Sequence, residues 1–494
     1  MAAEKRVSVL KNYLYSLSYQ ILLLIVPLIT MPYLARTIGI DNQGTFSILF
    51  AVSSCFVMLG CVGLNLYGQR EIAYYKNDEQ KRRRIFWEIE LLRIFTLFIS
   101  LFVYFAFVWF NTSVRHIVNV YEPLYFILFA VEIPSAMLDI SWYYQGIENF
   151  KIQTVRNFIV KLSGLALILI LIKDKYDLWL YIVIYTGMNL IGNLSLWVNK
   201  LRSEGFTRPD KSSFKTHFKR SAVMFLPQIA TTVYAQLDRV MIGGLVNDGN
   251  LQAGVYDNAE KIVKIALTVI TSIALVMLSR VANTYMKNDK DKAKGYIYSS
   301  FRLYMCLGTP IMLGVAGLAD SFVARFFSDT PNAQLIAPVI VMLSPIILFI
   351  GGSSVFGTQY LLPTNRVKPY TVSVFSGMIV NVIFNLLFIP GYGARGAAAA
   401  TVIAEFTVLA VQMFCLRREF SPMMYVHCWR NFVSGAVMLL CVIGLGRLTG
   451  GASLLSIIVQ VSVGAAVYFL LLLLLRDPFV KKYFKAATNR ILKH

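Results

Sequence analysis

The sequence predicts an all-α integral membrane protein of about 14 transmembrane helices, in two pseudo-symmetric six-helix lobes plus a C-terminal helix pair. Of its 494 residues, 57% are hydrophobic and only 15% are charged, and the mean hydropathy is +0.62. Soluble domains carry about 25% charged residues, so most of this surface is expected to face lipid. Apolar runs recur along the whole chain, and basic residues gather in alternate connections between them.

The apolar runs give the expected spans, since roughly 20 apolar residues are needed to cross a bilayer. The spans lie at approximately residues 12–35, 43–66, 88–110, 122–142, 157–172, 178–198, 222–246, 258–279, 303–324, 335–360, 369–390, 396–416, 431–446 and 453–475. An even number of spans places both termini on the same side of the membrane.

Lysine and arginine set the orientation of these spans. Both termini and the alternate loops between them carry 35 of the 47 basic residues, the opposite loops carry 7 and the spans carry 5. Because cytoplasmic loops are enriched in Lys and Arg, both termini are predicted to be cytoplasmic. The same bias explains the net charge of +21, which in a soluble chain would indicate nucleic-acid binding. We therefore expect no nucleic-acid partner.

The longest basic connection, residues 200–220, separates six spans from the remaining eight. A weak internal sequence repeat lies on either side of this connection. Gly44-Thr45-Phe46 follows the first span, and the similar Gly254-Val255-Tyr256 follows the seventh. Six spans per repeat would make the halves parallel repeats, as in some transporters. The expected domains are an N-terminal lobe at 1–205, a C-terminal lobe at 206–418, and the added helix pair with a cytoplasmic tail at 419–494.

Ionisable residues inside spans are expensive, at about 2.5–3.5 kcal/mol at a helix centre, and usually face a cavity or a partner. Arg93, Asp139 and Lys161 fall near the cytoplasmic ends of spans three to five. Their equal depth predicts that they lie within ion-pair reach of one another. Glu132 and Glu405 fall near mid-membrane and complete the expected intramembrane charge cluster. A purely structural role inside each lobe is the alternative for these residues.

Two lysines of span eight are the candidate substrate ligands. Lys261 and Lys264 lie one turn apart, so their side chains share a helix face. Lysine is a good point-charge ligand for phosphate, which predicts a phosphate-bearing substrate here. The nearby acids, Asp257, Glu260 and Asp238, are not expected to neutralise both lysines.

Motifs of enzymes and metal sites are absent from the sequence. It contains no G-x-x-x-x-G-K-[ST], H-E-x-x-H or G-x-S-x-G segment, and its four histidines and six cysteines show no metal-ligand spacing. The sequence therefore predicts a transporter and not an enzyme, with no metal and no cofactor. Coupling to an ion gradient or to the membrane potential is left open.

Several short segments, taken in order, resemble a known family. They are Lys11–Tyr13, Pro32–Gly39, Gly44–Phe46, Gly63–Leu64, Tyr67–Ala73, Trp142–Glu148, Gln236–Gly243 and Gly254–Ile262. Together with the fourteen-span layout they resemble the polysaccharide-transporter group of oligosaccharide flippases. That group belongs to the multidrug/oligosaccharidyl-lipid/polysaccharide exporter superfamily.

The resemblance implies two six-helix lobes around a central cavity, with export by alternating access from the inner to the outer leaflet of a bacterial cytoplasmic membrane. The implied substrate is a polyprenyl-pyrophosphate-linked repeat unit of a capsule, an O-antigen or a wall polymer. A polysaccharide polymerase and glycosyltransferases are possible partners. Asp238, followed by Arg239, and Lys261 fall at positions that the family pattern marks. Arg70 and Arg36 are expected to contact the lipid headgroup or to act at a gate.

Three alternatives remain at this stage. A flippase for a peptidoglycan precursor would be expected to carry more basic residues deep in span one, where this chain has only Gln20. A drug or cation exporter of the same superfamily normally has twelve spans. A membrane polysaccharide polymerase would carry a large external loop with catalytic Arg or His.

Overall fold

The computed structural model describes residues 22, 24–113, 117–118, 120, 122–210, 212–287, 289–421, 424–450 and 453–481, and these residues form helices and connections without a β-strand. The first predicted span is thus described only in its second half, as the apolar helix Leu24–Thr37. The chain divides into two compact units, Met1–Gly254 and Val255–His494.

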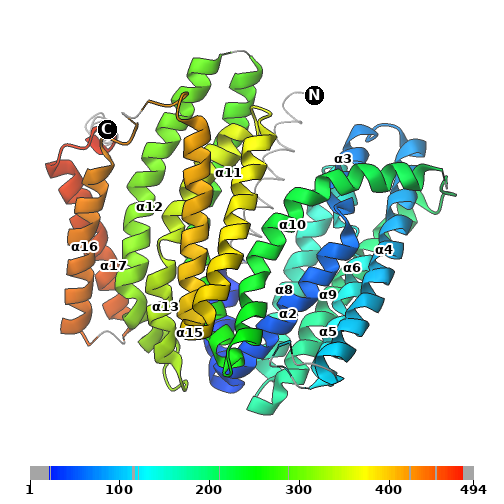
Figure 1. Ribbon diagram of the computed structural model, residues 1–494, viewed down its shortest axis with the longest axis horizontal. Helices are drawn as coiled ribbons and strands as arrows, with labels where there is room; N and C mark the ends of the chain where they lie inside the picture. Colours follow the sequence, from blue (N-terminus) through cyan, green and yellow to red (C-terminus); the bar gives the residue numbers. More distant parts are fainter. Residues whose placement is uncertain are drawn as a thin grey trace. The chain divides into compact units, whose positions relative to one another are not determined.

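The helices of the first unit follow one another with short connections (Figure 1). They are α2 (Gly39–Cys61), α3 (Leu64–Tyr74), α4 (Glu79–Ser113), α5 (Pro123–Ala130), α6 (Glu132–Met137), α7 (Ser141–Gly146), α8 (Phe150–Leu171), η1 (Lys175–Asp177), α9 (Leu178–Glu204) and α10 (Ser213–Leu245). Helix α2 is central, because 67% of its apolar stretch is buried, against 17% for α8.

The second unit contains most of α11 (Gly249–Met286) and all later elements. They are α12 (Lys290–Phe326), η2 (Ala333–Leu335), α13 (Ile336–Leu343), α14 (Ile346–Ser353), the π-helical η3 (Ser354–Leu361), α15 (Val367–Leu416), α16 (Cys428–Leu448) and α17 (Leu454–Leu474). Helices α16 and α17 pack on each other and on α12, as Figure 1 shows at the end of the chain.

Breaks within the predicted spans have identifiable causes. Helix α5 ends just before Pro134, whose missing N–H and ring are incompatible with an unbroken helix. Pro345 lies at a bend of 41° between the helices on either side of it. In α15, Gly393 has φ 54° and ψ −127°, which divides this 50-residue helix where the sequence predicts two spans.

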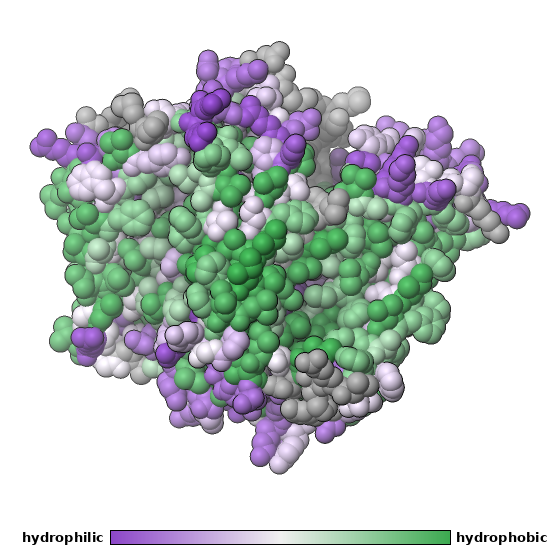
Figure 2. Space-filling view, in the orientation of Figure 1, coloured by the Kyte–Doolittle hydropathy of each residue, from purple (hydrophilic) through white to green (hydrophobic). Residues whose placement is uncertain are grey.

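The surface of each unit has the character of a membrane protein. Large apolar side chains are exposed along α4, α16 and α17, among them Trp109, Leu440 and Leu455. Figure 2 shows apolar residues over the middle of the helices and hydrophilic residues near the helix ends. Within the described residues, nine helices are long and apolar enough to cross a membrane, and one bent pair brings this to ten. The protein is an all-helical, multi-pass membrane protein, and the total of fourteen spans remains a prediction.

The division between the units differs from the predicted lobe boundary at 205/206. Helix α10 packs on α2, α3 and α4, so the first unit extends to Gly254. The limits of the predicted lobes and of the added segment 419–494 remain predictions.

Candidate functional site

The two predicted phosphate ligands lie on α11 and are both paired with acids of the same helix. Lys261 Nζ lies 2.5 Å from Asp257 Oδ2, and Lys264 Nζ lies 2.7 Å from Glu260 Oε1. Both acids are buried, whereas both lysine side chains are more than 40% exposed. The expectation that the nearby acids leave one lysine unneutralised is therefore wrong, because an i, i+4 spacing gives each lysine its own carboxylate.

Asp238 and Arg239 are both buried on α10. The Arg239 guanidinium donates to the carbonyl of Ala235 at 2.9 Å, one turn earlier, and lies 3.5 Å from Gln236 Oε1. Part of the Arg239 guanidinium is thus hydrogen-bonded on its own helix. These residues belong to the first unit and the α11 lysines to the second, so an Asp238–lysine pair remains a prediction.

The two predicted headgroup or gate arginines differ in their surroundings. The Arg70 side chain is half-exposed on α3, lies 3.4 Å from Glu71 Oε1, and sits 5.6 Å from the centre of the Tyr67 ring. Arg36 is exposed near the end of the helix that precedes α2. Both positions can meet a ligand from outside the helix bundle, and their role remains a prediction.

Arg93 is fully buried on α4, and its carboxylate partner is Glu90, one turn earlier on the same helix. Arg93 Nη1 donates to Glu90 Oε2 at 3.0 Å and to the backbone carbonyl of Asp139 at 2.6 Å, while Nη2 donates to the carbonyl of Ala136. Trp142 Nε1 donates to the same Glu90 oxygen at 3.3 Å. Arg93 therefore ties α4 to the irregular segment around α6 and α7.

The prediction that Arg93, Asp139 and Lys161 pair with one another is corrected, because the carboxylate partner of Arg93 is Glu90. The Asp139 carboxylate accepts from the backbone N–H and the hydroxyl of Ser141 and acts on Arg93 electrostatically, while the direct contact of Arg93 is with the Asp139 backbone carbonyl. Lys161 lies instead over the Tyr185 ring, at 5.9 Å, within the electrostatic reach of Glu132.

Glu132 and Glu405 occupy separate environments. Glu132 accepts from Asn189 Nδ2 at 3.1 Å, between α6 and α9. Glu405 is buried on α15, in the second unit, where it acts electrostatically on Tyr370. Within the first unit, Arg93 pairs with Glu90 while Glu132 acts on Lys161, and the relation of these charges to Glu405 remains a prediction.

A buried polar network, which no sequence pattern predicted, lies at the N-terminal ends of α4 and α10. Glu88 Oε2 accepts from His217 Nε2 at 3.0 Å, and the Tyr67 hydroxyl lies 2.8 Å from His217 Nδ1. Glu88 Oε1 accepts from Arg84 Nε and from the backbone N–H of Asp210, both at 2.9 Å. Tyr67, Glu88 and His217 are buried, so the network fixes α10 and the preceding loop to α3 and α4.

The loop end of this network is exposed to solvent. Arg84 Nη2 lies 2.6 Å from Asp210 Oδ2. The backbone N–H of Ser212 and then the Arg84 guanidinium hold the pKa of Asp210 below its usual value, because both favour the charged carboxylate.

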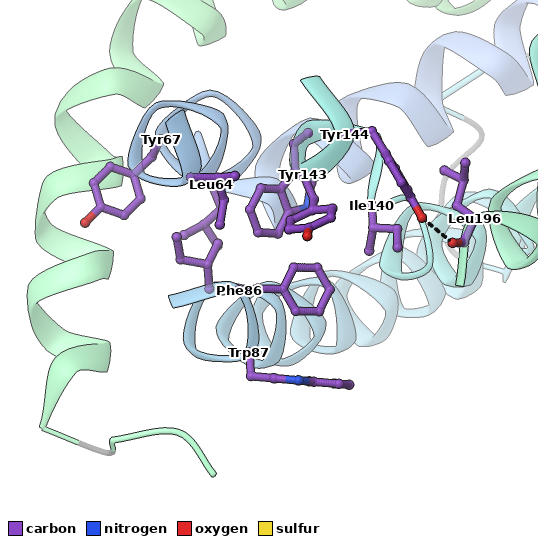
Figure 3. Close-up of a cluster of buried hydrophobic side chains, with 11 residues drawn as sticks. Leu64, Tyr67, Phe86, Trp87, Ile140, Tyr143, Tyr144 and Leu196 are labelled. Atoms are coloured by element: carbon purple, nitrogen blue, oxygen red, sulfur yellow. Dashed lines mark hydrogen bonds between the residues drawn. The ribbon is translucent and has the colours of Figure 1, made fainter. Parts of the chain in front are cut away.

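An aromatic cluster lies beside the network, as Figure 3 shows. Phe86 stacks on Trp142 with ring centres 5.5 Å apart, and the Tyr144 hydroxyl donates to the carbonyl of Leu196 at 2.8 Å. Lys200 is almost completely buried, and its ammonium lies 4.3 Å from the centre of the Phe86 ring and 4.2 Å from that of Tyr143. Cation–π contacts of this kind keep a lysine in a packed core.

The described residues include no group of three His, Cys, Asp or Glu side chains able to hold a metal ion. Among their charged side chains are two ion pairs on α11 and one ion pair on α4. Such groups can bind and release a charged ligand, or stabilise a helix contact.

Two family models match more than half of the chain. The model described as "Polysaccharide biosynthesis protein" matches residues 9–282, and the model described as "Lipid II flippase MurJ" matches residues 167–469. The two matches overlap across α10 and most of α11.

Individual relatives agree with these matches. A protein of Escherichia coli (strain K12) that is named as an O-antigen transporter is 22% identical over 434 residues, covering 84% of this chain and 98% of that protein. The solved lipid II flippase MurJ, in an inward closed conformation, has a TM-score of 0.75 at 14% identity, covering 94% of this chain and 99% of that one. An inward-facing MATE multidrug transporter has a TM-score of 0.62 at 14% identity, covering 80% and 94%. The chain therefore belongs to the polysaccharide biosynthesis and MurJ families of the multidrug/oligosaccharidyl-lipid/polysaccharide (MOP) exporter superfamily.

Proposed function

We propose that this protein is a flippase that moves a polyprenyl-pyrophosphate-linked oligosaccharide from the inner to the outer leaflet of a bacterial cytoplasmic membrane by alternating access. The observation that carries the proposal is that a polysaccharide biosynthesis model, at residues 9–282, and the lipid II flippase model, at residues 167–469, both match this all-helical, multi-pass chain. The protein is a transporter and not an enzyme.

The nature of the relatives supports a lipid-linked glycan as the substrate. The Escherichia coli relative is named for O-antigen transport, and the solved flippase for lipid II. The solved flippase also covers more of this chain than the multidrug transporter does, 94% against 80%. A capsule, O-antigen or wall-polymer repeat unit fits this pattern better than a drug.

The structure supports a revised role for the α11 lysines. Both lysine side chains are more than 40% exposed while their acid partners are buried, so each lysine can release its carboxylate and turn to a pyrophosphate. A pyrophosphate crossing a low-dielectric region needs compensating positive charge, because an unpaired ion there costs several kcal/mol. In this proposal Arg70 and Arg36 contact the headgroup at the entrance.

The remaining expectations belong to the same proposal. Both termini are cytoplasmic, as the distribution of Lys and Arg supports. Transport is coupled to an ion gradient or to the membrane potential, with no bound cofactor. A polysaccharide polymerase and glycosyltransferases act before or after the flippase on the same lipid-linked glycan.

Reconstitution tests the proposal. Proteoliposomes carrying a fluorescent polyprenyl-pyrophosphate oligosaccharide in the inner leaflet should show protein-dependent appearance of the label outside, measured by quenching with membrane-impermeant dithionite. Parallel vesicles carry lipid II or a cationic drug. Faster movement of lipid II would favour a peptidoglycan-precursor flippase, and movement of the drug alone would overturn the proposal.

A further inference from the structure

The second unit contains a polar pocket at the start of α16, away from the α11 lysines. Side chains of α12, of the first turn of α16 and of the segment after α17 line it, and it is a shallow, open hollow whose empty space of about 340 Å³ includes the solvent in front of it. The residues that matter are Arg302, His427, Asn431 and Asp477.

Two lining groups lack a partner among the described residues. The Arg302 side chain is exposed and makes no hydrogen bond or ion pair with a described residue. His427 Nδ1 is buried and has no hydrogen-bond partner in the same part of the chain. The pocket also lies at the N-terminus of the 21-residue α16, which favours a negative group. These features suit a phosphate.

The opposite charge comes from Asp477, which is 5% exposed. Its Oδ1 accepts from the backbone N–H groups of Phe479 and Val480, at 2.9 and 3.2 Å. Arg302 and Asp477 both line the pocket, and both act electrostatically on the thiol of Cys428. The lining thus presents one guanidinium and one carboxylate, which match a zwitterion better than a simple anion.

The surroundings of the pocket suit a lipid. Val426, Trp429 and Phe432 are exposed apolar side chains at its edge, and Trp is enriched where a membrane meets water. Arg430 lies 5.6 Å from the centre of the Trp429 ring and donates to the carbonyl of Arg476 at 3.1 Å. The apolar faces of α16 and α17 continue from this edge, since most of both helices is exposed.

We propose that the pocket binds the phosphoethanolamine headgroup of a membrane phospholipid, in the cytoplasmic leaflet under the predicted orientation. The phosphate is held by Arg302, and the ammonium by Asp477. His427 Nδ1 adds a hydrogen bond, either as a donor to the phosphate or as an acceptor from the ammonium. The acyl chains lie along α16. A transported pyrophosphate would meet the Asp477 carboxylate with no ammonium to neutralise it, so this lipid is a resident ligand and not the substrate.

Native mass spectrometry of the full chain tests the proposal. The protein in detergent is offered phosphatidylethanolamine, phosphatidylglycerol and phosphatidylcholine with identical acyl chains, and also soluble phosphoethanolamine. Phosphatidylethanolamine should be retained best, because choline has no N–H for Asp477 and glycerol has no positive charge. Equal retention of the three lipids, or better retention of phosphatidylglycerol, would overturn the proposal. Binding of soluble phosphoethanolamine as tightly as the lipid would remove the lipid part of it.

Variants assign the effect to the pocket. Arg302→Gln should reduce retention of phosphatidylethanolamine by roughly tenfold. Asp477→Asn should abolish the preference over phosphatidylcholine, because an amide keeps the Oδ1 acceptor and loses the charge. Arg447→Gln, at the other end of α16, is the matched control and should change nothing. Since Arg302 is exposed, its variant decides the result if Asp477→Asn fails to fold, and unchanged retention of phosphatidylethanolamine in Arg302→Gln would refute the site.

Discussion

Gly44 of α2 and Gly254 of α11 approach each other so closely that neither position has room for a side chain. A Cβ atom at Gly44 would lie 1.7 Å from the carbonyl oxygen of Asn250 and 2.6 Å from the backbone nitrogen of Gly254. A Cβ atom at Gly254 would lie 2.0 Å from the carbonyl oxygen of Ile40. These are the glycines of the two Gly-x-aromatic segments that echo each other in the sequence, so backbone contact explains the residue type at both.

Gly44→Ala should destabilise the protein by about 3 kcal/mol, because overpacking against backbone cannot be relieved by a side-chain movement. Thermal unfolding in detergent measures the loss. Gly187→Ala is the matched control, since a Cβ atom there meets nothing within 4 Å inside α9. The control should be neutral or stabilising by up to about 1 kcal/mol. Equal stability of the two variants would contradict the close contact.

Arg93→Ala should cost about 3–5 kcal/mol, because it leaves the Glu90 carboxylate buried without its cation. Unfolding curves of the purified protein give the change. The double variant Glu90→Leu/Arg93→Met should recover most of the loss, since a well-packed apolar pair can replace a buried ion pair. The exposed pair of Arg83 and Glu79 on the same helix is the comparison, and Arg83→Ala should cost under about 1 kcal/mol. A double variant no better than Arg93→Ala would refute this account.

Lys261→Ala should reduce glycolipid export while membrane insertion is retained, and Lys261→Arg should keep more export because positive charge is the property needed. The charge-balanced variant Asp257→Asn/Lys261→Gln separates two explanations. If the lysine binds pyrophosphate, this variant stays as slow as Lys261→Ala in the reconstituted assay. Recovery of the wild-type rate would show that the lysine only neutralises Asp257.

Lys264 gives an independent test of the same face. Lys264→Ala and the pair Glu260→Gln/Lys264→Gln should follow the same pattern. A double variant of both lysines to alanine that exports at the wild-type rate would exclude α11 as the phosphate site.

The loop before α10 should loosen in acid. The native pKa of Asp210 lies below the unfolded value of about 3.9, so its contribution is complete above about pH 4 and is lost as the pH falls through the native pKa. A spin label at Thr207→Cys should therefore become more mobile below about pH 4. In an Asp210→Asn background the label should already be mobile at neutral pH, and its acid response should be smaller. Identical spectra at pH 7 and pH 3 would count against the carboxylate.

The predicted orientation can be read from the same position. In a background without the native cysteines, Thr207→Cys should react only with reagents that reach the cytoplasm, whereas Tyr176→Cys, between α8 and α9, should react from outside intact cells. Labelling of Thr207→Cys from outside would reverse the topology.

The sequence predicted helix positions well because hydrophobic length is a local property. The described helices that are long and apolar enough to cross a membrane can be found with a 20-residue window alone, and Gly393 in α15 and Pro345 between α13 and α14 are visible directly in the sequence. The total of fourteen spans remains a prediction, because the described residues contain nine helices long and apolar enough to cross a membrane, or ten with the bent pair.

Charge partners were predicted poorly, for two different physical reasons. Glu90 and Arg93 are three residues apart on one helix, and this spacing, which is visible in the sequence, predicts their ion pair. Equal depth in the membrane, the basis of the predicted cluster, does not. Glu88 and His217 are 129 positions apart in the chain, and no local sequence pattern predicts their contact. The depth of a residue gives its position along the membrane normal only. Its contacts also depend on the direction in which the side chain points from the helix axis.

The network around Glu88 also bears on how the protein can be engineered for imaging. The basic connection before α10 looks like the natural place to insert a rigid fusion domain for cryo-electron microscopy, because it is long and polar. Yet the Gly205 carbonyl accepts from Trp87 Nε1 at 3.1 Å, and the Asp210 N–H donates to the Glu88 carboxylate. An insertion there would break both links, so a fiducial marker belongs elsewhere, for example between α11 and α12. There, among the described residues, the Asp289 side chain bonds only within its own turn, to the backbone N–H of Lys292.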